Sequence, residues 1–121
     1  MRLVRGMDLE GKLQLNDRKL CLLNPPKGFA FDGPTADKPT PGGAVLLFVA
    51  TLADVKKNKA PVVAAAKRDD HAWIAYPKAG QLGTDLNRDI LWQFLLKDGI
   101  QGVRQIAIDD VWSAMRFRPK K

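Results

Sequence analysis

The chain has 121 residues, one cysteine and a formal net charge of +7. A single cysteine excludes a disulfide within the chain, and the fractions of hydrophobic (45%) and charged (27%) residues are typical of a globular protein. A chain of this length buries roughly two-thirds of its unfolded surface, so we predict a single domain over residues 1–121. No apolar segment follows Arg2 and Arg5, and the longest apolar run, residues 44–50, is too short to span a bilayer. We therefore expect a cytosolic (cytoplasmic) protein with no membrane partner.

The basic residues are spread evenly along the chain. Residues 1–60 hold 10 basic and 6 acidic side chains, and residues 61–121 hold 10 and 7. Two local clusters remain, at residues 56–59 and in a basic tail at residues 116–121. A solvated surface explains both clusters, but they also fit weak electrostatic contact with a nucleic-acid backbone.

The first elements are a lead-in and a short buried strand. Residues 1–18 are expected to be loosely structured, with three leucines that attach a short helix to the body, namely Leu9, Leu13 and Leu15. The continuous apolar run at residues 19–23 predicts a buried strand, which ends because Pro25 and Pro26 cannot continue a ladder. Cys21 lies within this run, where a buried, inert thiol is expected.

A long loop follows at residues 25–43. It contains five prolines and four glycines, and loops of this length in a compact domain are often functional. The alternative is a surface excursion that Phe29 and Phe31 hold against the body.

Residues 44–99 alternate between strands and helices. We predict strands at residues 44–49 and 72–76, and between them a helix at residues 51–68 that Pro61 interrupts. The next helix is expected to begin at a cap on Thr84 or Asp85 and to end before Gly99. Its inward face is expected to hold Leu86, Ile90, Leu91, Phe94 and Leu95.

The chain ends in a predicted hairpin of two strands, residues 103–108 and 113–117. Both segments alternate apolar and polar residues, and only four residues separate them. Asp109 and Asp110 fall in that connection. Adjacent aspartates are typical of turns, although a carboxylate pair can also act in acid–base chemistry or hold a hard cation.

This order of elements predicts an α/β three-layer sandwich with a five-stranded mixed sheet. Right-handed crossovers make the first three strands parallel, and the hairpin places one strand against the others. The outline resembles the second half of a Rossmann-like methyltransferase, which implies the order 1-2-3-5-4 with the fifth strand antiparallel. A flavodoxin-like sheet is the alternative.

Four motifs carry a closer resemblance. They are Leu22-Leu23-Asn24-Pro25-Pro26-Lys27-Gly28-Phe29, Trp73-Ile74-Ala75-Tyr76-Pro77-Lys78, Thr84-Asp85-Leu86 with Arg88-Asp89, and the segment from Ile108 to Phe117. Together they resemble a family of small bacterial proteins defined as a domain of unknown function. The likeness covers most of the chain from about residue 12, departs from the family in the longer loop at residues 32–43, and implies no activity.

A ligand site in such a fold lies beyond the carboxyl ends of the parallel strands. Five residues are expected near that edge: Asn24, Lys27, Tyr76, Lys78 and Thr84. Lys27 and Lys78 would attract a small anion, and the Tyr76 hydroxyl would point toward it. The alternative is that Tyr76 is a core ring and that both lysines are solvated.

The turn after the first strand argues against a working methyltransferase. S-Adenosylmethionine sites need a glycine-rich turn with free backbone amides, whereas Pro25 and Pro26 have no N–H group to donate. We therefore predict no cofactor. The single histidine, His71, has no second histidine or cysteine partner, so we predict no metal.

The tryptophans suggest a different kind of surface. Trp92 falls off the inward stripe of its helix, beside Leu96, and an exposed pair of this kind would bind a protein partner or a second copy of the chain. A wide buried helix face is the alternative.

Three functions remain open. The leading hypothesis is a non-enzymatic binding or interaction module on a degenerate methyltransferase-like scaffold. The second is an enzyme or binder that acts on a small anionic or nucleotide ligand at the strand ends. The third is a weak nucleic-acid binder that uses residues 56–59 and the basic tail.

Overall fold

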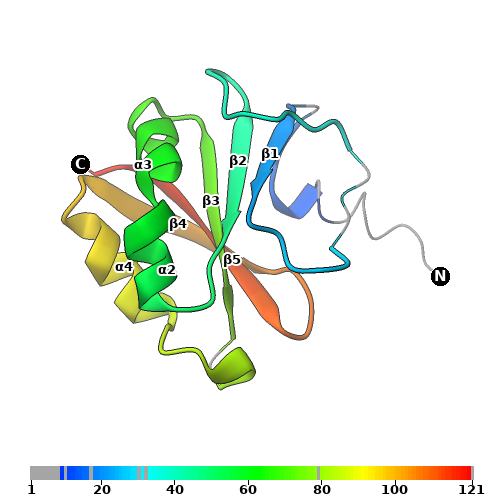
Figure 1. The fold of residues 1–121 in the computed structure, drawn as a ribbon. Coiled ribbons are helices and arrows are strands. Elements are labelled where there is room, and N and C mark those ends of the chain that lie inside the picture. Colours follow the sequence, from blue (N-terminus) through cyan, green and yellow to red (C-terminus); the bar gives the residue numbers. More distant parts are fainter. Residues whose placement is uncertain are drawn as a thin grey trace.

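The computed structural model describes residues 9, 11–16, 18–29, 31, 33–78 and 80–120. They form an α/β fold around a five-stranded mixed sheet in the order β1-β2-β3-β5-β4 (Figure 1). The strands are β1 (Leu20–Leu23), β2 (Ala44–Phe48), β3 (His71–Pro77), β4 (Ile100–Ala107) and β5 (Trp112–Pro119). β1, β2 and β3 are parallel, and β5 is antiparallel to both β3 and β4. The predicted strand order and the reversed fifth strand are confirmed.

Three α-helices lie together on one face of this sheet (Figure 1). They are α2 (Leu52–Asn58), α3 (Ala60–Lys67) and α4 (Arg88–Leu96), and the short 3-10 turn η1 (Gln81–Gly83) precedes α4. The predicted interruption at Pro61 is confirmed, because α2 ends before Lys59 and the proline lies in the first turn of α3. A proline is tolerated there since its missing N–H would have no partner within the helix.

The helix-side core follows from the alternation of the strands. Alternate residues of β1, β2 and β3 point toward the helices and pack against their apolar faces, together with Ile100 of β4 and with Met115 and Phe117 of β5. Cys21 belongs to this core and is buried, as predicted. Burial raises the pKa of its thiol, and the charge of Asp37 raises it further. The thiol is therefore protonated near neutral pH, the unreactive form.

The second face of the sheet is covered by a helical turn and by loops. Leu9, Leu13 and Leu15 are buried against it, so the described part of the lead-in is attached to the body as predicted. The indole Nε1 of Trp73 donates a hydrogen bond of 3.1 Å to the Leu13 carbonyl and fixes this turn. Residues 1–8, 10 and 17 of the predicted lead-in lie outside the described part of the chain.

The long loop between β1 and β2 wraps around the outer edge of the sheet. Thr35 forms a parallel bridge with Leu20. Phe29 and Phe31 pack against the second face, and the Phe29 ring lies 4.8 Å from the Phe48 ring in an edge-to-face arrangement. The loop is thus held against the body by its two phenylalanines.

Two details of the predicted C-terminal half are wrong. α4 is capped by Asn87, whose side chain accepts from the Ile90 amide at 2.9 Å, and not by Thr84 or Asp85. Ile90 is 39% exposed instead of inward-facing, because it lies beside the buried stripe that Leu91 and Leu95 form. Phe94 is half-buried and packs against the helix-side core, as predicted.

The hairpin strands are longer than predicted. β4 begins at Ile100, and β5 continues to Pro119. Arg116 and Arg118 of the predicted basic tail therefore belong to a strand, while Lys121 lies outside the described residues.

Candidate functional site

A hollow of about 350 Å³ opens at the carboxyl ends of β1 and β2. It is bounded by the turn after β1, the end of β2, one side of α2 and the start of β5. Its lining consists of Asn24, Pro26, Phe48, Val49, Ala50, Asp54, Lys57, Asn58 and Trp112. This is the edge where open α/β sheets bind ligands, and the volume suits a small molecule.

The turn after β1 forms one wall. Asn24 adopts a left-handed backbone conformation with φ of +54°, which asparagine tolerates better than most residues. The two prolines that follow donate no backbone hydrogen bonds. The wall therefore offers the Asn24 side-chain amide where a nucleotide-binding turn would offer glycine amides.

The opposite wall is one side of α2. The helix begins with a reciprocal cap, because the Asp54 amide donates to Thr51 Oγ1 at 3.3 Å and Asp54 Oδ2 accepts from the Ala50 amide at 2.9 Å. Asn58 also bonds within the helix, since its Nδ2 donates to the Asp54 carbonyl at 3.0 Å. These contacts hold Asp54 and Asn58 in place and leave the Lys57 ammonium as the positive charge on this wall.

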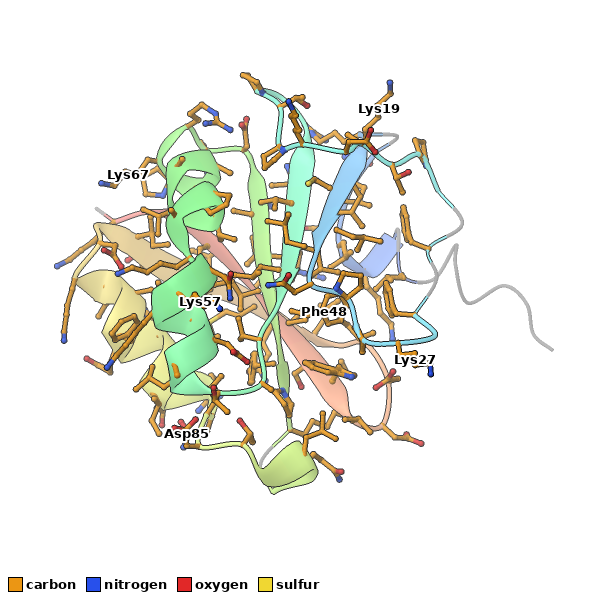
Figure 2. The ribbon with its side chains drawn as sticks, in the orientation of Figure 1. Lys19, Lys27, Phe48, Lys57, Lys67 and Asp85 are labelled. Atoms are coloured by element: carbon orange, nitrogen blue, oxygen red, sulfur yellow. The ribbon has the colours of Figure 1, made fainter. Side chains whose placement is uncertain are left out.

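Aromatic rings close the hollow on the sheet side. The Phe48 ring packs edge-to-face on Trp112 with 5.2 Å between centroids, and Phe29 packs on Phe48 from the loop. In Figure 2, Phe48 lies between Lys57 on α2 and Lys27 on the loop. The site thus combines an apolar base with an amide and an ammonium at its rim.

The structure brings only one of the five predicted strand-edge residues into this hollow. Asn24 lines it, whereas Lys27 is exposed on the loop that follows and is not part of the lining. Lys78 is half-buried, and its backbone amide donates to the Val111 carbonyl at 2.7 Å. Lys27 and Lys78 therefore do not line the hollow together.

Thr84 fixes the position of the segment before α4. Its Oγ1 donates to the Ala50 carbonyl at 2.5 Å and accepts from the Leu86 amide at 3.0 Å. The neighbouring Asp85 lies near the start of α2 in Figure 2 and accepts a hydrogen bond from the Leu52 amide at 2.8 Å. Thr84 and Asp85 thus tie the segment before α4 to the start of α2, behind one wall of the hollow.

Tyr76 is a core residue on the helix side of the sheet, only 2% exposed. Its hydroxyl has no hydrogen-bond partner among the described residues. Burial raises the pKa of this phenol, and the nearby Arg88 and Gln105 partly oppose that rise. The ring packs with the core and does not line the hollow.

The Asp109–Asp110 pair forms the predicted turn. Asp109 Oδ1 accepts from the amides of Val111 and Trp112, both at 2.8 Å, while Asp110 is exposed. Asp109 thereby fixes the start of β5 and the position of Trp112 beside the hollow. In the described part of the chain, no three His, Cys, Asp or Glu side chains lie together as metal ligands would.

The two other predicted surfaces are the one around Trp92 and the basic cluster at residues 56–59. Trp92 is 38% exposed and Leu96 half-buried, so the expected partner surface stays a prediction. In the basic cluster, Lys59 pairs with Asp98 at 2.8 Å. Lys56 and Lys59, with Lys97, surround the Phe94 ring at 6.0, 4.9 and 5.4 Å, which is within cation–π range.

Sequence reasoning missed most of the lining. The sequence does contain a pattern that points to Asp54. Thr51 is followed three residues later by this acidic residue, which is the pattern of a capping box at a helix start. No local pattern indicated Trp112, since its place beside β2 depends on how the hairpin pairs with β3.

Comparison with known proteins assigns the chain to no family. No protein-family model matches the chain, and no curated protein matches it either. The resemblance to a bacterial domain of unknown function stays a prediction. No helix in the described ranges is long and apolar enough to cross a membrane.

Proposed function

We propose that this protein is a non-enzymatic binding module on a degenerate, Rossmann-like methyltransferase scaffold, and that it holds a small anionic ligand in the hollow. The observation that best supports this proposal is the composition of the hollow, in which the Asn24 amide and the Lys57 ammonium flank an aromatic base. Ligand sites commonly combine an apolar lining with a few polar groups that fix orientation.

The scaffold part of the proposal rests on the strand order and on the turn after β1. The order 1-2-3-5-4 with a reversed β5 is the arrangement expected of that scaffold. Pro25 and Pro26 stand where the cofactor of a methyltransferase would need backbone amides. The edge of the sheet is thus retained as a place for a ligand, with different chemistry at its rim.

The binding part of the proposal rests on the state of the polar side chains. Asp54 is the carboxylate in the lining, and it is occupied by the cap of α2. No nucleophile stands beside a general base among the lining residues, which is the pair that covalent catalysis needs. Lys57 and Asn24 suit an anionic group such as a carboxylate or phosphate.

Thermal unfolding against a panel tests this proposal. The panel holds S-adenosylmethionine, S-adenosylhomocysteine, nucleotides and small dicarboxylates. A ligand at about 100 times its Kd adds about 2.7 kcal/mol to the free energy of unfolding and raises the midpoint by several degrees. A tenfold loss of affinity in Lys57→Gln lowers that gain to about 1.4 kcal/mol.

Lys56→Gln is the matched control, because this lysine is next in the chain on α2 but does not line the hollow. We expect Lys56→Gln to respond like the wild type, and Asn24→Gly, which tolerates the left-handed backbone, to respond less. A panel without any shift, or a shift that Lys57→Gln and Asn24→Gly leave intact, would contradict the proposal.

A further inference from the structure

Arginines converge on the face of the sheet opposite the three helices. Arg116 on β5 stands directly across from Arg104 on β4 in the antiparallel register. Opposite residues of such a pair share one face, with about 5 Å between their Cβ atoms. Arg18 joins them from the segment before β1, close enough for its charge to act on Arg116.

This arrangement is electrostatically unfavourable by itself. Like charges directly opposite each other destabilise an antiparallel pair. The nearby acid, Asp69, is already engaged, because Arg118 binds both of its carboxylate oxygens at 2.7 and 2.8 Å. Among the described residues, Arg104 and Arg116 have no carboxylate partner within ion-pair distance.

The guanidinium groups also have unused donors. Arg18 Nη1 donates to the Leu15 carbonyl at 3.0 Å, and Arg116 Nη1 reaches Gln14 Oε1 only at 3.5 Å. Arg116 Nε is buried and has no hydrogen-bond partner in the described part of the chain. A buried donor without an acceptor is costly, and an anion that drew the Arg116 side chain outward would relieve that cost.

The charges around Arg116 act on each other. Burial lowers the pKa of Arg116, and the charges of Arg118, Arg18 and Arg104 lower it further, against the effect of Asp69. Burial together with Arg116 and Arg18 lowers the pKa of His71 to about 4. His71 is therefore neutral near pH 7, and the positive potential here comes from the arginines.

We propose that Arg18, Arg104 and Arg116 form an anion site that binds a phosphate group. Guanidinium groups bind oxyanions through paired N–H donors. Three of them from three segments match the several oxygens of a phosphate better than the two of a carboxylate. The phosphate has two conceivable sources, a small phosphorylated molecule or a nucleic-acid backbone, and the experiment separates them. The site is independent of the hollow, which lies at the carboxyl end of β2.

The test is a titration of the tag-free protein at low salt with inorganic phosphate, pyrophosphate and a short single-stranded oligonucleotide, followed by NMR. His71 is the single histidine of the chain, so its ring signals report the site without ambiguity. We expect phosphate or pyrophosphate to shift these signals saturably. Arg104→Gln and Arg116→Lys should each weaken binding about tenfold or more, because each removes a pair of N–H donors. A tenfold loss of affinity corresponds to about 1.4 kcal/mol.

Arg88→Gln is the control, because this exposed arginine lies on α4, on the other face of the sheet. Arg104 is also exposed, so Arg104→Gln is expected to fold, and without phosphate its unfolding midpoint should equal or exceed that of the wild type. Binding by the oligonucleotide with a steep salt dependence identifies a nucleic-acid source, and binding by pyrophosphate alone identifies a small molecule. The proposal is overturned if none of the three probes shifts His71, or if Arg104→Gln and Arg116→Lys bind as tightly as the wild type.

Discussion

His71 shows how the fold changes the properties of a single side chain. In the sequence it is only the single histidine, but in the structure it is half-buried at the start of β3 beside Arg116 and Arg18. Its pKa falls from 6.5 to about 4 for that reason. The sequence gives no sign of this, because the arginines come from distant segments.

This pKa predicts a stability loss in mild acid. Between about pH 6.5 and pH 4 the unfolded chain binds the proton and the folded protein does not, so the free energy of unfolding falls as the pH is lowered through that window. We expect His71→Gln to lose less stability than the wild type between pH 7 and pH 4.5 in urea unfolding. Identical pH dependence in the two proteins would refute the prediction.

Residue-level predictions succeeded where the cause is local. Cys21 lies within an apolar run and is buried, and Asp109 caps its own turn, as the neighbouring residues indicate. Tyr76 lies within β3 and is the core ring that the alternative interpretation predicted. Lys27 was predicted from the strand end, but the direction of a side chain beyond a strand depends on the loop. No pattern in the sequence defines that loop geometry.

At the scale of elements, α4 shows why helix starts are hard to predict. Thr84, Asp85 and Asn87 are all good N-cap residues, and the sequence does not say which of them caps the helix. The structure engages Thr84 and Asp85 with the end of β2 and the start of α2, which leaves Asn87 for the cap. Tertiary contacts therefore decide the helix start.

Loss of this cap has a measurable effect. Asn87→Ala removes the acceptor for the Ile90 amide, so we expect the free energy of unfolding to fall by about 1 kcal/mol. In a domain of this size that lowers the midpoint by about 4 °C. Gln93→Ala, at an exposed position within the same helix, is the control and should leave the midpoint unchanged or slightly raised. Equal midpoints for Asn87→Ala and the wild type would show that another residue supplies the cap.

At the scale of the whole molecule, the sheet was the most predictable feature. Crossover connections and a four-residue hairpin leave few possible topologies. The order 1-2-3-5-4, which the resemblance to a Rossmann-like methyltransferase implies, is the one observed. The covering of the second face was less predictable. Trp73, Phe29 and the buried leucines of the lead-in meet there through contacts between segments far apart in the sequence, such as the bond from Trp73 to Leu13.

The same long-range assembly defines the hollow. Four separate segments contribute to it, and of the five residues expected at this edge from the sequence, Asn24 alone is among its lining residues. The location at the strand ends was nevertheless predicted, because it follows from the fold class. The fold therefore predicts where a ligand binds more readily than which side chains contact it.

The most direct test of the central claim is an amide NMR map of the isotope-labelled protein with the ligand panel at millimolar concentration. If the hollow is the ligand site, at least one compound shifts the signals of Asn24, Ala50 and Asn58 and the indole signal of Trp112 together. The amides of β4 should stay unchanged with compounds that lack phosphate. Shifts confined to other parts of the molecule, or no shift with any compound, would contradict the proposal that this edge of the sheet binds a small anionic ligand.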